Sequence, residues 1–406
     1  RSPISTEVKL VDLESNFNCN VTSNPTLGRK YCEVKTLRES LTMPIELADY
    51  REDALFHARN SFCVALLIPL CGSAGIWAPS CISSAQVAVA ELNQSGGILG
   101  RKVKLIMIDA AVETTEPIEE IINDLIDLGA IDAIVGMHIS AIRQRLSKVV
   151  CQRIPYIYTP LYEGGETTAG LFAIGETPQE QLGPAITRLQ QIYKPKKWAL
   201  IGNDYVWPRS SNSYAKICLK QMNVDVVMEH YVPFGLKNMT PLLDNLEASG
   251  ADAVLVSLVG QDAVQFNRAF GRRGLDSRIL RLACALEENG LLACGKSNLE
   301  RLFSVSSYFG SISTQENAAF KERYYNLLGE TAPALNTIGQ STYEGMQYLA
   351  ALLQDFEDVW RERSTQDCLP VSYHSGRSFL RSGTVSRPAV YLARADGMQF
   401  CDFKLL

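Results

Sequence analysis

The sequence predicts an α/β protein with two Rossmann-like lobes, each built on a parallel sheet, and a ligand cleft between them. Three observations support this fold class. Apolar runs of strand length alternate with helix-length segments from residue 61 onward, which is the pattern of a parallel sheet with right-handed crossovers. The alternation begins again near residue 179. A chain of 406 residues also exceeds the size that a single core usually serves.

The first unit is predicted to contain four strands with helices between them. Residues 62–70 are apolar throughout, as expected for a strand buried on both faces. The strands are predicted at 62–70, 103–109, 133–135 and 155–158, and the helices at 80–93, 115–128 and 140–150.

The second unit repeats this order. Its helices are predicted at 179–193, 210–222, 239–248 and 262–272, and its strands at 198–201, 224–231, 253–258 and 302–308. Two units of similar size and order predict two similar lobes, although no residue-level repeat joins them.

The last elements are predicted to return to both lobes. Helices at 315–328 and 338–360 precede strands near 389–393 and 399–403. If these helices complete the first lobe and these strands the second, the chain crosses between the lobes several times, and such a hinge permits closure on a ligand. The predicted division is an N-terminal extension at 1–60, a first lobe at 61–172 with 306–366, and a second lobe at 173–305 with 367–406.

The composition fits a folded protein without a nucleic-acid partner. The chain is 46% hydrophobic and 20% charged, with a net charge of −5, which excludes a disordered chain and a basic, polymer-binding one. Eleven cysteines leave at least one unpaired, and Cys19 and Cys32 are candidates for a disulfide in a polar segment. Glycosylation sequons at Asn20, Asn93 and Asn238 slightly favour an extracytoplasmic location over a cytoplasmic one.

The segment 200–212, LIGNDYVWPRSSN, is the most informative about a ligand. Tyr205 and Trp207 follow the end of a predicted strand, and Pro208 stands where a helix can begin. Aromatic residues there lie at the carboxyl end of a strand, where open α/β sheets bind ligands. The two rings could instead pack in the core. However, a short loop after Asp204 offers no buried face, so ligand contact is predicted.

Four segments resemble a known family of ligand-binding domains. They are Asn93–Arg101 (NQSGGILGR), followed by a strand ending at Asp109, Val135–Ser140 (VGMHIS), Tyr158–Gly164 (YTPLYEG) and Ile201–Asn212 (IGNDYVWPRSSN). The first resembles type I periplasmic-binding-protein-like domains. The other three resemble the branch with the amide-sensing regulator of amidase operons and the urea and amide transport receptors. The resemblance covers roughly residues 62–400.

The resemblance implies ligand-contacting residues in both lobes. They are Ser140, Tyr158, Tyr205, Trp207, Ser257 and Gly260, and Tyr308 falls near the expected return to the first lobe. His138 departs from the pattern, because an aromatic hydroxyl is often found there, and Trp207 stands where a Tyr would be closer to it. Thr159-Pro160-Leu161 is also shifted against the usual Pro-Thr-Pro.

Several of these residues have a second reading. Ser140 could be an ordinary helix N-cap as well as a ligand donor. His138 is read as a residue of the cleft wall, without metal-ligand spacing to the other histidines. Tyr308 and Tyr343 could pack between the lobes instead of touching a ligand. Glu163 could cap or brace the crossover, or meet a ligand ammonium.

One motif points to another class of protein. Gly290–Ser297, GLLACGKS, matches the phosphate-binding pattern GxxxxGK[ST]. That pattern works when a strand runs directly into the loop, whereas here Glu287 and Glu288 precede Gly290. A nucleotide-binding enzyme is therefore kept as a remote alternative.

The predicted function is binding and closure without catalysis. The chain is expected to be a sensor or receptor for a small polar molecule such as an amide, a urea or an amino-acid-like compound, and to pass its signal to a protein partner. The alternative is a solute-binding receptor of an ABC transporter. No cofactor or metal is expected, and a homodimer through the first lobe is possible.

Overall fold

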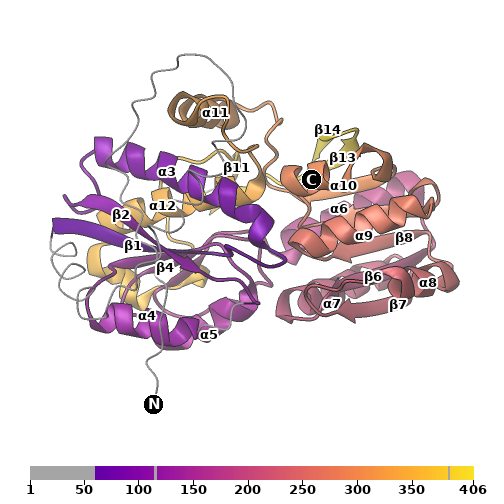
Figure 1. The fold of residues 1–406 in the computed structure, drawn as a ribbon, viewed down its shortest axis with the longest axis horizontal. Helices are drawn as coiled ribbons and strands as arrows, with labels where there is room; N and C mark the ends of the chain where they lie inside the picture. The colour runs from indigo at the N-terminus through magenta and orange to yellow at the C-terminus, as the bar shows by residue number, and fades with distance from the viewer. Residues whose placement is uncertain (1–59, 114–116, 383–384) are drawn as a thin grey trace, which may run out of the picture.

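Two sheets organise the part of the chain that the structure describes, and each forms the centre of one lobe (Figure 1). The structure is a computed structural model that describes residues 60–113, 117–382 and 385–406. The predicted N-terminal extension at 1–60, including Cys19, Cys32 and the sequon at Asn20, therefore lies outside the described residues except for residue 60.

The first sheet has five parallel strands in the order β2-β1-β3-β4-β5. Alternate residues of the central strand point to opposite faces: Phe62, Val64 and Leu66 belong to one core cluster and Cys63, Ala65 and Leu67 to another. Its strands are β1 (Ser61–Ile68), β2 (Lys102–Asp109), β3 (Ala133–Gly136), β4 (Tyr156–Tyr158) and β5 (Leu171–Ala173).

Helices cover both faces of the first sheet. α3 and α12 pack together on one face, where α11 also contacts α3, and α4 and α5 cover the other (Figure 1). Their bounds are α3 (Ala78–Gln94), α4 (Ile118–Asp127), α5 (Ser140–Val150), α11 (Gln315–Leu328) and α12 (Thr337–Phe356).

The second sheet has seven strands in the order β14-β13-β10-β9-β8-β6-β7. The five strands from β10 to β7 are parallel, and β13 and β14 are antiparallel additions at one edge. The strands are β6 (Lys197–Asn203), β7 (Asp225–Val232), β8 (Ala253–Ser257), β9 (Leu280–Ala283), β10 (Leu302–Ser306), β13 (Tyr391–Asp396) and β14 (Gln399–Leu405).

The helices of the second lobe also divide between the two faces of their sheet. Apolar residues of α6 and α7 join one core cluster, and those of α8, α9 and α10 join the other. The bounds are α6 (Pro178–Tyr193), α7 (Val206–Gln221), α8 (Thr240–Ser249), α9 (Gly260–Arg272) and α10 (Glu288–Cys294).

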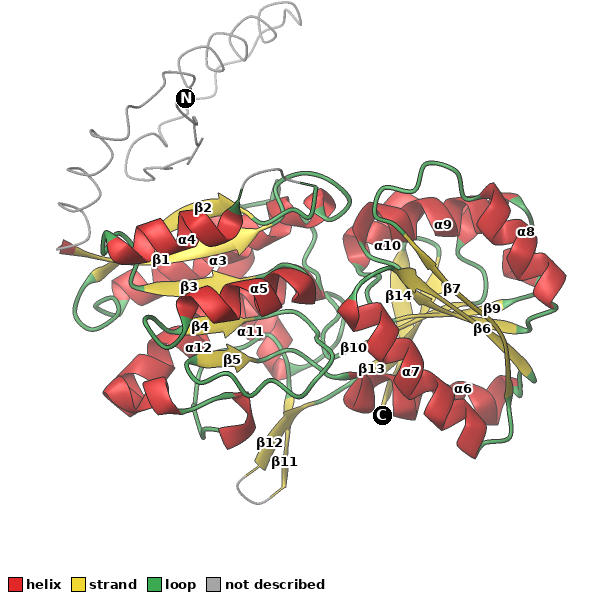
Figure 2. Ribbon diagram, turned by 90° about the horizontal axis from the view of Figure 1, so that it is seen from below, coloured by secondary structure: helices red, strands yellow, loops and turns green. Residues whose placement is uncertain are grey.

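The chain passes between the two sheets three times within the described residues. The first crossing, residues 174–177, joins β5 to α6, and the second, residues 307–314, joins β10 to α11. The third, residues 368–390, leads from a 3₁₀ turn (Thr365–Asp367) beside β5 to β13 and contains the hairpin of β11 (Phe379–Ser382) and β12 (Val385–Pro388). The hairpin projects from the junction of the lobes in Figure 2.

The predicted fold class, two α/β lobes with mainly parallel sheets, is confirmed. The residue boundaries of the two lobes, as given in the sequence analysis, stay a prediction. The helix predicted at 338–360 is shorter at its end: α12 stops at Phe356, and Glu357, with a φ of +41°, turns the chain into the 3₁₀ segment Glu357–Glu362.

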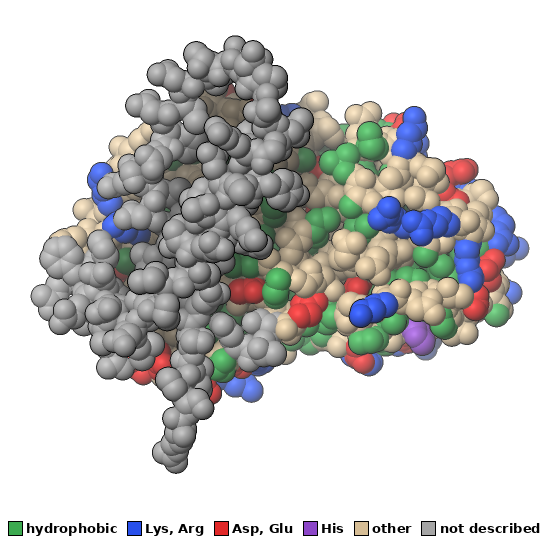
Figure 3. Space-filling model, viewed as in Figure 1, with side chains coloured by type: hydrophobic (Ala, Val, Ile, Leu, Met, Phe, Trp, Pro, Cys, Tyr) green, Lys and Arg blue, Asp and Glu red, His purple; other side chains and the backbone are tan. Residues whose placement is uncertain are grey.

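The surface of the second lobe carries charges of both signs side by side on the face seen in Figure 3. Such a mixture agrees with the small net charge of −5. Among the helices of the described residues, none has the length and apolarity needed to cross a membrane.

Candidate functional site

A small cavity lies between the lobes, at the carboxyl ends of strands from both sheets. Its volume is about 20 Å³, which is room for about one water molecule, so the lobes stand nearly closed around it. Its walls are formed by Trp77, His138, Ile139, Ser140, Tyr158, Pro160, Leu161, Tyr205, Trp207, Val259, Ala285 and Ile338. Apart from Ile338 on α12, these residues lie at or after the ends of parallel strands, which is where α/β folds bind ligands.

His138 stands in the loop between β3 and α5 and is almost fully buried. Its Nδ1 lies 3.1 Å from the carbonyl oxygen of Ile139, and its Nε2 lies 2.9 Å from the hydroxyl of Tyr156. Because a carbonyl can only accept, Nδ1 carries the proton and Nε2 accepts from Tyr156. Burial, helped by the charge of Arg143, lowers the pKa of His138 to about 4. The ring is therefore neutral at physiological pH.

Two hydroxyls complete the wall from the first lobe. Tyr158 donates its proton to the carbonyl oxygen of His138 at 2.7 Å. The oxygen of Tyr158 therefore faces Ser140 Oγ, 3.4 Å away, as an acceptor. Ser140 is the first residue of α5, whose N-cap is Ile139. Ser140 thus combines a hydroxyl whose contact to Tyr158 is long with the N-terminus of a helix, where backbone N–H groups lack partners.

Arg143 supports this wall from one turn further along α5. Its guanidinium lies 4.9 Å from the ring centre of Tyr158 and donates to Ser140 Oγ at 3.4 Å. Its buried charge is balanced by Glu166 at 2.9 Å and Glu163 at 2.6 Å, as a buried ion requires. Of the two readings of Glu163, the structure favours the brace, because one carboxylate oxygen also accepts from Gln144.

The sequence reasoning missed Arg143. Its spacing of three residues from Ser140, on one helical face, was the available signal. Its acidic partners come from a loop about twenty residues later, so only the fold shows that they belong together.

The second lobe supplies aromatic rings to the cavity. Tyr205 is the N-cap of α7 in an extended conformation, and its ring centre lies 6.2 Å from that of Trp207 and 5.4 Å from that of Phe234. Burial raises the pKa of Tyr205 well above its usual value. Neither the hydroxyl of Tyr205 nor the indole N–H of Trp207 has a hydrogen-bond partner among the described residues. Both are donors that a ligand can use.

The cavity wall thus brings together five predicted site residues, His138, Ser140, Tyr158, Tyr205 and Trp207.

The structure does not place Ser257 or Tyr308 in this wall. The hydroxyl of Ser257 donates to Asn212 Oδ1 at 3.2 Å, toward α7. That of Tyr308 donates to Asn317 Oδ1 at 2.8 Å, on α11. Tyr343 donates to Glu91 at 2.7 Å, which favours packing between α12 and α3 over ligand contact.

Gly260 lies where the lobes touch beside the cavity. A Cβ on Gly260 would lie 2.1 Å from the carbonyl oxygen of Ser73, in the loop after β1. The same oxygen accepts a hydrogen bond of 2.6 Å from the backbone N–H of Gln261. Gly260 also has a φ of +52°, which glycine adopts without strain. The N-terminus of α9 therefore closes directly onto the first lobe.

The GLLACGKS motif does not form a phosphate-binding loop. Gly290 lies inside α10, and Lys296 begins a 3₁₀ turn. The side chain of Glu287 caps α10 by accepting from the backbone N–H groups of Asn289 and Gly290. A phosphate would need those N–H groups, so the motif gives no support to the nucleotide alternative. Within the described residues, no three His, Cys, Asp or Glu side chains are placed to hold a metal ion.

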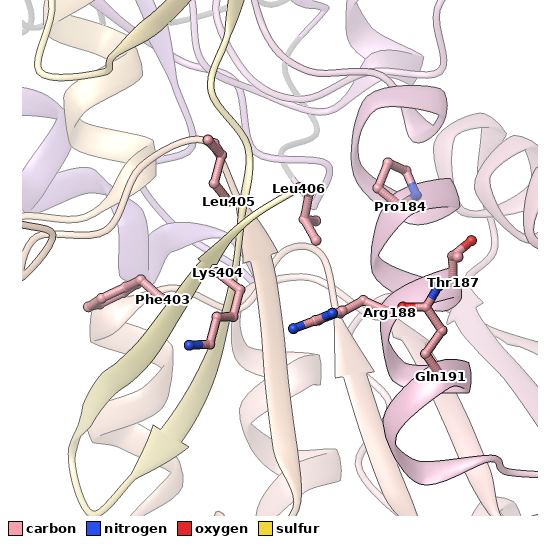
Figure 4. Close-up of a pocket in the computed structure, with 8 residues that line it drawn as sticks. All are labelled: Pro184, Thr187, Arg188, Gln191, Phe403, Lys404, Leu405 and Leu406. Carbon is pink, nitrogen blue, oxygen red and sulfur yellow. The ribbon is translucent and has the colours of Figure 1, made fainter.

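A larger hollow of about 640 Å³ lies on the second lobe, between α6 and β14. Figure 4 shows Arg188 reaching from α6 toward the C-terminal strand. This groove is walled by exposed side chains such as Lys404 and Leu405, on the edge strand of the second sheet. We therefore place the candidate site in the smaller cavity between the lobes, where polar groups converge.

Comparison with known families agrees with this architecture. Residues 62–367 match the family described as periplasmic binding protein. The chain belongs to the periplasmic binding protein family. The predicted resemblance to type I members of this family is confirmed.

Solved periplasmic binding proteins share the fold at low sequence identity. A solute-binding protein of an ABC transporter from R. palustris, in complex with 4-hydroxybenzoate, has a TM-score of 0.73 and 16% identity, covering 85% of this chain and 96% of that chain. A branched-chain amino acid transporter substrate-binding protein from Streptococcus pneumoniae, in complex with isoleucine, has a TM-score of 0.68 and 15% identity, covering 85% and 99%.

Curated relatives are similarly distant. An amino acid binding protein of Pseudomonas aeruginosa is 24% identical over 228 residues, which is 55% of this chain and 61% of the relative. A Leu/Ile/Val-binding protein homolog of Brucella melitensis is 21% identical over 348 residues, which is 82% of this chain and 91% of the relative. The match thus spans less than two thirds of the Pseudomonas relative.

Proposed function

We propose that this periplasmic binding protein is a solute-binding receptor of an ABC transporter that closes on a small, planar, uncharged molecule bearing a hydrogen-bond acceptor. The observation that carries the proposal is the interlobe cavity in which Ser140, Tyr205 and Trp207 converge. The solved relatives named above are transporter components, which supports this reading over the sensor that the sequence favoured.

The lining of the cavity argues against a ligand that carries an ammonium group. It contains no Asp, Glu, Lys or Arg, and its one histidine, His138, is neutral. An ammonium group enclosed there would lose its hydration without gaining a carboxylate partner. The chain therefore differs from what the names of its amino-acid-binding relatives would suggest.

The polar groups of the wall favour an acceptor on the ligand. Tyr205 and Trp207 offer unpaired donors. Ser140 accepts from Arg143, and its own proton faces the Tyr158 oxygen at a long 3.4 Å, so a ligand acceptor can compete for that proton. The N-termini of α5, α7 and α9 also lie at the cavity, and their partial positive charge attracts a carbonyl oxygen.

Amides and ureas have this chemistry, in line with the resemblance of segments 135–140, 158–164 and 201–212 to the amide and urea branch. The flat rings around the cavity suit a planar group of this kind. In this proposal the receptor acts outside the cytoplasm and delivers its ligand to a membrane permease. A homodimer through the first lobe stays a prediction.

A thermal-shift screen followed by calorimetry tests the ligand chemistry. The panel is acetamide, urea, isoleucine, 4-hydroxybenzoate and Mg-ATP. An uncharged amide or urea should raise the melting temperature, and Tyr205→Phe should weaken its binding by about tenfold, the cost of one hydrogen bond in a dry site. Tyr231→Phe, which removes a hydroxyl bonded to Glu229 on the exposed strand β7, is the matched control.

Stabilisation by isoleucine alone would contradict the uncharged ligand. Stabilisation by Mg-ATP that Lys296→Ala abolishes would contradict a binding receptor altogether. The transport role is tested by adding the ligand-loaded protein to its permease in vesicles, where uptake should depend on the protein.

A further inference from the structure

We propose that Arg377 is the positioning residue of lobe closure, because it ties the three crossings together so that they bend as one unit. The proposal deepens the proposed function by naming what controls closure at that site. Only the measurement of ligand affinity rests on the proposed function.

Arg377 lies in the third crossing and contacts both of the others. Its Nη2 donates to the carbonyl oxygen of Ile174 at 2.9 Å, in the first crossing. Its Nη1 donates to the hydroxyl of Ser307 at 3.1 Å, in the second crossing. The backbone N–H of Ser307 in turn donates to Glu176 Oε1 at 2.7 Å. The three crossings are thus joined pairwise through one guanidinium and one carboxylate.

The group is anchored to the first lobe by Glu344 of α12. Its two oxygens accept from Arg377 Nε at 2.7 Å and from Nη2 at 2.5 Å, a bidentate geometry that adds both strength and direction. Glu344 also accepts from three neighbouring side chains, Gln340, Tyr373 and Ser375. We call Arg377, Glu344, Glu176 and Ser307 the hinge cluster.

The charged side chains of the hinge cluster are almost completely buried. The side chains of Arg377, Glu344 and Glu176 are 3%, 0% and 5% exposed. Burial by itself would lower the pKa of Arg377, but Glu344 and Glu176 raise it above its ordinary value. The guanidinium therefore stays charged. Breaking such a pair leaves a buried charge uncompensated, so the crossings have a strong reason to keep their relative positions.

This arrangement determines how the lobes can move. Hinge closure concentrates dihedral changes at a few residues, and three separate crossings could each change independently. The planar guanidinium has five donors in a fixed fork, and here the fork reaches a carbonyl, a hydroxyl and a carboxylate on separate segments. A lysine at this position could not span them.

Small-angle X-ray scattering of the ligand-free protein is the direct test. Arg377→Met should increase the radius of gyration and broaden the distance distribution, because untied crossings allow the lobes to separate further. Binding of a stabilising ligand should weaken by about tenfold, since a smaller fraction of molecules is competent to close. No residue of the cleft is changed.

Two further variants separate this role from general stability. Arg281→Met removes another buried arginine, which bonds to Asn267 and the backbone of Glu300 within the second lobe alone. It should lower the melting temperature without changing the radius of gyration. Arg377→Met with Glu344→Leu replaces the pair by apolar side chains, which often restores stability; its radius of gyration should remain enlarged.

An unchanged radius of gyration in Arg377→Met would overturn the proposal. So would a wild-type radius in the double variant, since the uncompensated Glu344 would then be the cause. Because scattering is measured without ligand, the hinge proposal can fail or stand independently of which ligand the cleft accepts.

Discussion

His138 contributes a neutral ring rather than a hydrogen-bonding group to the cleft. Both of its nitrogens are engaged within the first lobe, by Ile139 and Tyr156. In the proposed receptor, the polar contacts to the ligand therefore come from Ser140 and Tyr205 rather than from His138. The aromatic hydroxyl that the family pattern suggests for position 138 is replaced by apolar surface.

This burial predicts an acid-sensitive contribution to stability. The pKa of His138 is about 4 in the folded protein and about 6.5 in the unfolded chain. Between these values the unfolded chain binds a proton that the folded one does not, so the free energy of unfolding falls as the pH falls from 6.5 to 4. The contribution is about 3 kcal/mol.

Guanidinium chloride melts at pH 7, 6, 5 and 4 measure this loss. His138→Leu with Tyr156→Phe removes both partners of the buried hydrogen bond, which limits its cost, and should show a shallower loss toward pH 4 than the wild type. His230→Gln, on exposed strand β7, is the control substitution. Equal pH dependence in wild type and double variant would contradict the assignment.

A site residue could be predicted when the local sequence marks its position in the fold. Tyr205 and Trp207 follow a strand end that the sequence marks with an apolar run and a turn, so they could be placed in the cleft. Ser257 is the last residue of β8, and its short side chain points at a face of the sheet. The hydroxyl of Tyr308 is bonded to Asn317 and does not line the cavity. No local sequence pattern reveals this partner.

At the scale of elements, α9 approaches the loop after β1 through a close backbone contact that only a residue without a Cβ allows. Gly260→Ala should therefore oppose closure rather than folding, because Ser73 belongs to the other lobe. Ligand affinity should fall by about tenfold or more, while the left-handed conformation adds a strain of about 1 kcal/mol to the folded state.

A second glycine provides the matched comparison. Gly250, at the end of α8, has a φ of +66° and nothing within 4 Å of a Cβ. Gly250→Ala carries the backbone strain alone, so its melting temperature should drop as in Gly260→Ala while calorimetry gives unchanged affinity. Equal affinity in both variants would show that the α9 contact plays no part in closure.

Most elements could be predicted from the sequence, but some short strands could not. The helix 315–328 was predicted with the bounds of α11. A strand of three or four residues is too short for a period to develop, so its prediction depends on its surroundings. The sequence indicated β4, whereas it did not indicate β5 or β9.

At the scale of the whole molecule, the narrow cavity identifies the described arrangement as a closed one. A ligand larger than a water molecule must enter through a more open form, which requires an equilibrium between the two. Adding a stabilising ligand should therefore reduce the radius of gyration in scattering experiments. A radius that stays constant at saturation would contradict closure on the ligand.

In the proposed receptor, the hydrogen bond from Gln261 to Ser73 affects the rate of ligand release as well as the affinity. It closes the molecule beside the cavity, across from the crossings that hold the lobes together. In the proposed receptor, a bound molecule leaves when this contact opens, so its dwell time depends on how often α9 parts from the first lobe. Two ligands of equal contact quality would then share one release rate, set by the protein.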